Sequence, residues 1–208
     1  MRDGAATGAA RREDAARFPS GFDFTTHVRA LCEDICRRLD ALAHVDMRRV
    51  EVGFAQTRTA SRYGMYASLT PLRFPGGREE TCRRGRRWRI QKVIGPDGRE
   101  ALYLLNFYLP RFLDLPLIEK LHTVVHELWH IGPRFDGDSR RFGGRCHAHS
   151  GSQARYDACV ARLVQQWLAA NPPEPVYAFL RFSFAELAAR YGRVYGRRVS
   201  APKLYPVD

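Results

Sequence analysis

The sequence predicts an α+β fold in one domain, with residues 20–208 folded and residues 1–19 forming a flexible N-terminal tail. The order of periodic segments predicts this class, because one helical pattern precedes several strand patterns and further helical patterns follow them. The length of 208 residues suits one compact core. A hydrophobic share of 45% excludes a wholly disordered chain.

The first half of the chain is expected to contain one helix and a small, mostly antiparallel sheet. Apolar residues recur three or four positions apart from Phe24 to Ala43, which predicts an amphipathic helix. The arginine-rich segment Arg78–Arg89 is expected to form a basic loop. Apolar or alternating runs predict four strands, at Val50–Ala55, Gly64–Leu69, Trp88–Ile94 and Ala101–Leu109.

The second half of the chain is predicted to be mainly helical. A helix is expected from Pro116, a residue suited to a first turn, to Ile131, because Gly132 and Pro133 then end it. A loop rich in glycine and arginine follows over residues 133–150. Further helices are expected over residues 152–170 and 184–191, and a terminal strand or extended tail over residues 197–206.

The charge of the chain is strongly positive. Lysine and arginine total 34 residues and aspartate and glutamate total 22, so the net charge is +12. This excess favours an acidic partner, with nucleic acid as the first candidate. Arginines could contact phosphates and a tryptophan could stack on a base, or the same segment could be a solvated loop. The candidate contacts are Arg83, Arg84, Arg86, Arg87 and Trp88.

Cysteine use and hydropathy predict a cytoplasmic protein without a membrane span. No apolar run approaches the roughly 20 residues that a membrane helix needs. The first 20 residues lack the apolar segment of a signal peptide. The cysteines are five in number, and an odd count favours reduced thiols.

One motif in the predicted helix over residues 116–131 indicates a specific chemistry. Residues 126–130 read His-Glu-Leu-Trp-His, the HExxH pattern. Its two histidines are four residues apart, so they lie on one helix face, about 6 Å apart along the axis. Two imidazoles so placed can bind one Zn²⁺, and Glu127 beside them is suited to act as general base on a metal-activated water.

A catalytic zinc ion needs a third protein ligand, and three residues after the motif are candidates. Asp136 has the spacing of the last ligand in the pattern HExxHxxGxxH, but Pro133 stands where that pattern has glycine. His149 is favoured over His147, because it lies three helical turns before Val160 in the apolar stripe of the next predicted helix. A separate cluster of Cys146 and these histidines with Cys159 is a further alternative.

Other residues near the motif are candidates for contacts with a substrate. Tyr156 could donate a hydrogen bond to an oxyanion, or it could be a core residue. Arg145 could bind an anionic group of the substrate. Asn106 and Tyr108 alternate on the strand before the motif helix, where an exposed edge would pair with an extended peptide.

The motif and the residues after it resemble a known family. The stretch 126–131, then Phe135-Asp136-Gly137-Asp138, residues 141–144, and His149 through Tyr156-Asp157 resemble the predicted metallopeptidases of phages and bacteria. These are similar to the SprT-like zincins, and the likeness covers about residues 45–165. The resemblance implies a minimal zincin-like fold with His126, His130 and a downstream histidine as zinc ligands and Glu127 as base.

The sequence therefore predicts a zinc metallopeptidase that hydrolyses peptide bonds in a protein or peptide. Because SprT-like proteins act on DNA-bound proteins, the resemblance and the positive charge together suggest substrates associated with DNA. The alternative is a basic nucleic-acid-binding protein whose zinc site is structural or degenerate.

Overall fold

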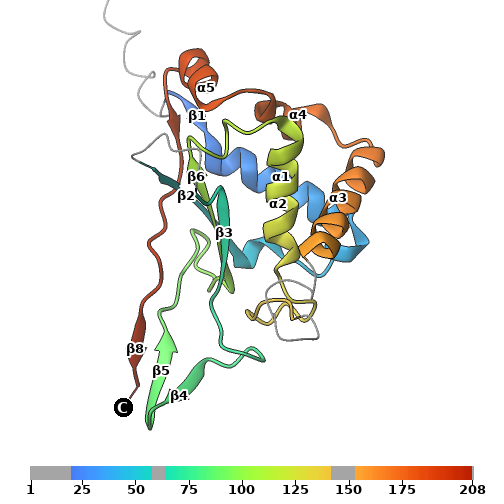
Figure 1. Cartoon of the computed structure of the whole chain (residues 1–208). Coiled ribbons are helices and arrows are strands. Elements are labelled where there is room, and N and C mark those ends of the chain that lie inside the picture. The colour runs from blue at the N-terminus through green and yellow to red at the C-terminus, as the bar shows by residue number, and fades with distance from the viewer. Residues whose placement is uncertain (1–19, 58–63, 142–152, 208) are drawn as a thin grey trace, which may run out of the picture.

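The computed structural model describes residues 20–57, 64–141 and 153–207, so the predicted tail over residues 1–19 lies outside the described residues. The predicted α+β class is confirmed. Figure 1 shows the helices gathered on one side of a central sheet, while a second, smaller sheet extends from one end of the molecule. The helices are α1 (Phe24–Arg38), α2 (Leu117–Trp129), α3 (Gln153–Ala169), α4 (Glu174–Tyr177) and α5 (Phe184–Tyr191), with short 3₁₀ turns at Asp40–Leu42, Met47–Arg49 and Ala178–Arg181.

The central sheet is built from β2 (Val50–Gln56), β6 (Tyr103–Leu109) and β3 (Ala67–Pro71) in the order β2-β6-β3. Strand β6 pairs with β3 in the antiparallel sense and with β2 in parallel along seven residue pairs. The strands were expected to form one small sheet, whereas the described residues form three. The parallel pair requires a long connection, and the chain between β2 and β6 contains β3 and two of the three strands of the second sheet.

The second sheet corrects the predicted loop over residues 78–89. This segment contains β4 (Glu80–Arg83) and β5 (Arg86–Ile90), an antiparallel hairpin that β8 (Leu204–Pro206) extends to three strands. The hairpin turn consists of Arg84 and Gly85, with φ angles of 53° and 76°. Two positive φ angles match the twist that a two-residue hairpin loop needs. The many charged residues here had suggested a loop, but alternating solvated side chains are equally compatible with an exposed sheet.

The main core lies between the central sheet and helices α1, α2 and α3. The predicted stripe of α1 is buried along its whole length, and Phe24 at its start packs edge-on against Phe107 of β6 with ring centroids 5.6 Å apart. Helix α1 ends at Arg38 and not at Ala43, because Leu39 has extended backbone angles of −105° and 110°. The two-residue pair of β1 (Phe22–Asp23) and β7 (Val194–Tyr195) closes one end of the fold.

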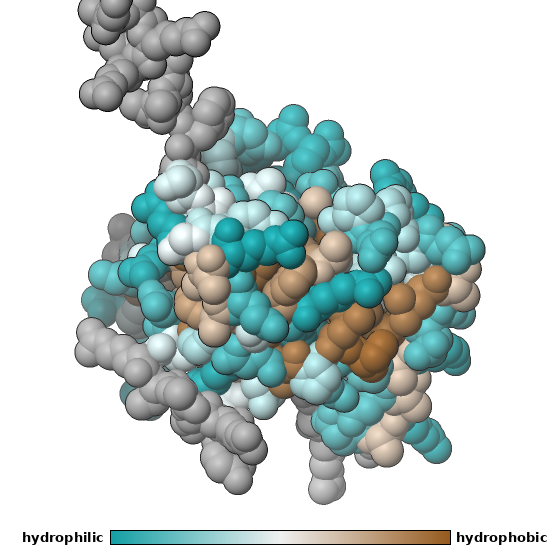
Figure 2. Space-filling model, turned by 90° about the horizontal axis from the view of Figure 1, so that it is seen from above, coloured by the Kyte–Doolittle hydropathy of each residue, from teal (hydrophilic) through white to brown (hydrophobic). Residues whose placement is uncertain are grey.

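The molecular surface mixes polar and apolar side chains. Figure 2 views the end that carries α5 and shows hydrophilic residues over most of this face, with smaller hydrophobic patches between them. Among the described residues, no helix combines the length and the apolar character that crossing a membrane requires.

Candidate metal centre

Helix α2 holds the two histidines of the HExxH motif at metal-binding spacing. One face of the helix is buried in the core through Leu121, Val124 and Leu128, all with 0% exposure, so the helix cannot rotate without exposing apolar surface. The side chains of His126 and His130 are half-buried, and their Nε2 atoms lie 3.1 Å apart. The two rings are nearly perpendicular, at 79°.

This separation fits a shared zinc ion. Two nitrogens bound to Zn²⁺ at 2.0–2.1 Å with a tetrahedral angle lie about 3.3 Å apart, close to the 3.1 Å between the Nε2 atoms of His126 and His130. Imidazole is also a ligand that zinc prefers. The imidazoles of His126 and His130 therefore match two ligands of one zinc ion in donor type and in spacing.

The general base expected at Glu127 is buried beside this pair. Its side chain lies on the same helix, and the residue is only 9% exposed. Burial raises the pKa of the Glu127 carboxyl to about 7, although a hydrogen bond from the backbone N–H of Leu69 in β3 opposes the rise. A carboxyl with this pKa can both accept and release a proton near neutral pH.

The end of α2 is anchored by the two residues that follow it and by two residues farther along the chain. The last four carbonyls of a helix lack full partners within the helix, so a stable end needs donors from elsewhere. All four accept hydrogen bonds here. They are His126 O from Tyr156 Oη (3.0 Å), Glu127 O from His130 N (3.2 Å), Leu128 O from Ile131 N (3.1 Å) and Trp129 O from Arg140 Nε (2.7 Å).

Tyr156 and Arg140 thereby hold the turn that contains both histidines. The Tyr156 ring packs against His126 and His130 with centroid separations of 4.9 and 5.4 Å. The Arg140 guanidinium stacks 3.7 Å from the centroid of the Trp129 ring. The backbone N–H of Arg140 donates to the His130 carbonyl at 2.7 Å. The sequence did not predict this role for Arg140, because no local pattern marks an arginine as the partner of a helix end eleven residues earlier.

The Tyr156 hydroxyl was predicted as a donor to an oxyanion, and the structure places it at the backbone of the motif. Burial, together with the nearby Glu127 carboxyl, raises the pKa of Tyr156 far above its usual value. The hydroxyl therefore stays protonated and can donate to the His126 carbonyl. This geometry supports a positioning role for Tyr156.

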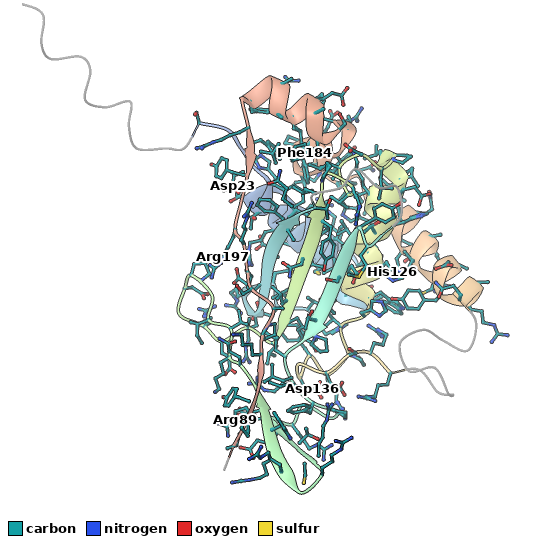
Figure 3. The ribbon with its side chains drawn as sticks, turned by 60° about the vertical axis from the view of Figure 1, so that its left-hand side comes forward. Asp23, Arg89, His126, Asp136, Phe184 and Arg197 are labelled. Atoms are coloured by element: carbon teal, nitrogen blue, oxygen red, sulfur yellow. The ribbon has the colours of Figure 1, made fainter. Side chains whose placement is uncertain are left out.

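A cleft of about 470 Å³ opens beside the two motif residues His126 and Glu127. It lies between α2, the start of α3 and the edge strand β3, and Figure 3 shows His126 beside that edge of the sheet. The cleft wall is mainly polar. Its lining residues are Tyr66, Ala67, Glu119, His122, Thr123, His126, Glu127, Asp157 and Val160.

The sheet edge that faces the cleft belongs to β3 and not to β6, which corrects the expectation for Asn106 and Tyr108. Both residues lie on the central strand β6, which has neighbours on either side. Tyr108 N donates to Tyr66 O at 2.9 Å, so alternation along the antiparallel ladder directs the backbone groups of Ala67 and Leu69 away from β6. The bond from Leu69 N–H to Glu127 agrees with this orientation.

The predicted candidates for a third ligand, Asp136 apart, lie outside the described residues. His147, His149, Arg145 and Cys146 all fall within residues 142–152, outside the described residues. Among the described ranges, no group of three histidine, cysteine, aspartate or glutamate residues could hold a metal ion. Asp136 instead pairs with Arg134 at 2.9 Å.

The apolar stripe used to favour His149 is confirmed where α3 is described. Its buried residues are Tyr156, Val160, Leu163, Val164 and Trp167. The bond from Tyr156 to His126 brings the first turns of α3 against the motif.

The basic residues predicted to contact nucleic acid lie apart from the cleft. Arg83, Arg84, Arg86, Arg87 and Trp88 belong to the β4–β5 hairpin, and none of them lines the cleft beside the motif. Figure 3 labels His126 and Arg89 on different parts of the molecule.

Comparison of the chain with protein-family models, with curated proteins and with solved structures finds no match.

Proposed function

We propose that this protein is a zinc-dependent metallopeptidase. His126 and His130 would bind the metal with His149, or alternatively His147, as the third ligand, and Glu127 would act as general base. The observation that carries this proposal is the convergence of two imidazole Nε2 atoms to 3.1 Å beside a buried carboxyl with a pKa of about 7.

The chemistry divides between the metal and the protein. When bound, Zn²⁺ supplies Lewis-acid polarisation of a carbonyl and acidification of water. Glu127 takes the proton of the attacking water and delivers it to the nitrogen of the leaving amine. The carboxyl is suited to both transfers because it lies beside the two imidazoles and burial raises its pKa to about 7.

The substrate class that fits the cleft is an extended segment of protein or peptide. Strand β3 is the outer strand of its sheet within the described residues, and Ala67 lines the cleft. The backbone groups of Ala67 that point away from β6 are suited to pair with such a segment by strand addition, while the Leu69 N–H donates to Glu127. Pairing there would hold a scissile bond beside His126 and Glu127.

The test compares wild type with Glu127→Gln in metal content and in proteolysis of an unstructured protein. We expect both to retain about one zinc ion, while Glu127→Gln loses roughly 10²- to 10⁴-fold in rate. Removal of zinc by a chelator should abolish wild-type cleavage, and added zinc should restore it. Cleavage by Glu127→Gln at the wild-type rate would refute the proposed mechanism.

Two further variants address the third ligand and the competing function. His149→Ala should lose zinc while His147→Ala retains it, and the reverse result would transfer the role to His147. A wild-type protein that binds zinc and cleaves nothing would favour the alternative, a nucleic-acid-binding protein with a structural or degenerate zinc site.

A further inference from the structure

The arginines of the β4–β5 hairpin lie on two faces that differ chemically. Side chains alternate along a strand, so Arg86 and Trp88 share one face of β5, while Arg87 and Arg89 share the other. Arg83 lies directly opposite Arg86 and joins the first face. On the second face, Glu80 pairs with both Arg87, at 3.5 Å, and Arg89.

The first face is cationic around a hydrophobic hollow. A cavity of about 630 Å³ opens there, lined by Arg83, Arg84, Arg86, Trp88 and Leu204. The described residues that line it include no carboxylate. Within the described part of the chain, neither Arg83 nor Arg84 forms an ion pair, and both are exposed. This face, defined by the five lining residues, is called the Trp88 face below.

The third strand of its sheet supports the Trp88 face. Strand β8 places Pro206 opposite Trp88 and Leu204 opposite Ile90. The backbone N–H of Val207 donates to the carbonyl of Arg87 at 3.0 Å. The indole of Trp88 is half-buried in this sheet and lines the hollow.

We propose that the Trp88 face binds single-stranded nucleic acid. Arg83, Arg84 and Arg86 surround the hollow with positive charge that matches a run of phosphates, and Trp88 with Leu204 offers an apolar surface for a base. A duplex keeps its bases stacked inside, so only an unpaired strand can present both a base and its phosphates here. An acidic peptide would match the charge but would leave the indole without a planar partner.

The inference is independent of the proposed peptidase. The Trp88 face belongs to the β4-β5-β8 sheet, whereas the HExxH cleft lies between α2, α3 and β3. A protein that does not bind nucleic acid would therefore not contradict the peptidase proposal. A protein without peptidase activity would not contradict the proposal that the Trp88 face binds nucleic acid. Where both hold, the natural substrates would be proteins bound to single-stranded nucleic acid.

The test measures fluorescence anisotropy of a labelled 15-nucleotide oligo(dT) with the full-length protein. Contacts of Arg83 and Arg84 with two phosphates predict a salt slope of about −1.4, so the dissociation constant should rise roughly 7-fold between 50 and 200 mM salt. Trp88→Leu should weaken binding roughly 5- to 100-fold. The intrinsic tryptophan fluorescence of wild type should be quenched on binding.

A matched pair of arginine variants separates the Trp88 face from general charge. Arg83→Ala and Arg87→Ala each remove one positive charge from the same hairpin, but only Arg83 lines the hollow. We expect Arg83→Ala to weaken binding several-fold and to reduce the salt slope by about 0.7, while Arg87→Ala changes little. Equal effects of the two variants would overturn the proposal.

Competing ligands complete the test. The proposal is overturned if duplex DNA of the same length or a poly-glutamate peptide binds as tightly as oligo(dT), or if oligo(dT) does not bind at 50 mM salt. Thermal unfolding of each variant verifies that it is folded. If Trp88→Leu is not folded, the comparison of Arg83→Ala with Arg87→Ala still decides.

Discussion

Replacing Tyr156 with phenylalanine removes one oxygen atom from the anchor of the HExxH helix. The phenyl ring keeps its positions against His126 and His130, whose centroids lie 4.9 and 5.4 Å away. The lost contact is the 3.0 Å hydrogen bond from the Tyr156 hydroxyl to the His126 carbonyl. The change therefore separates the polar anchor from the packing of the aromatic ring.

The expected magnitude follows from the burial of this contact. Tyr156 is 2% exposed, so water cannot easily replace its hydroxyl at the carbonyl. A buried acceptor that loses its partner costs about 1–3 kcal/mol of unfolding free energy. For a chain of this size each kcal/mol corresponds to about 2–4 °C in Tm, so the drop should be a few degrees. Loosening the turn that orients two ligands should also weaken zinc binding roughly 10- to 100-fold.

The assay uses urea unfolding and thermal melts of the metal-free protein, followed by zinc titration against a competing chelator. Tyr177→Phe is the matched control, because its ring packs against Trp167 with centroids 5.5 Å apart and its hydroxyl makes no hydrogen bond within the described residues. Wild-type stability and wild-type zinc affinity in Tyr156→Phe would refute the view that the hydroxyl positions the motif.

Two further predictions concern stability. The Lys120 ammonium is 2% exposed and burial lowers its pKa to about 8, so between pH 8 and 10.5 the unfolded chain binds more protons than the folded one. The contribution of Lys120 to the free energy of unfolding thus rises with pH. Measured by urea titration from pH 7.5 to 9.5, the free energy of unfolding of wild type should rise by about 2 kcal/mol relative to that of Lys120→Met. A constant difference between the two proteins would contradict this. Arg140→Ala should lower the free energy of unfolding, measured with urea, by about 1–3 kcal/mol. It loses both the stacking of the guanidinium on the Trp129 ring and the side-chain hydrogen bond to the Trp129 carbonyl. Arg140→Lys should restore little of it, and full rescue by lysine would count against the planar stacking argument.

Local patterns in the sequence predicted the elements that have one buried face. The stripe of α1 and the stripe of α3 were read from apolar spacing, and both are buried as expected. The two histidines were placed on one helix face by the same periodicity, and their Nε2 atoms converge. Such predictions succeed because a helix of 3.6 residues per turn sets which side chains are neighbours without reference to the rest of the chain.

Features that depend on partners far along the chain could not be predicted in this way. The alternation of Asn106 and Tyr108 is the same in a central strand as in an edge strand, and only the pairing of β6 with both β2 and β3 decides between them. The arginine-rich composition of residues 78–89 predicts a solvated loop, whereas this segment contains a hairpin of two strands. Its sheet is completed by β8, more than 110 residues later.

By itself, the sequence determined the α+β class, the helix that carries HExxH, and the residue types that can bind zinc and move a proton. The tertiary structure decided how those residues are held. It buried Glu127 beneath the edge of β3, anchored the end of α2 with Tyr156 and Arg140, and divided the hairpin arginines between a paired face and a cationic hollow. The physical reason is that residue type and spacing act within a few turns, whereas burial, pKa and hydrogen-bond partners depend on which distant segments pack together.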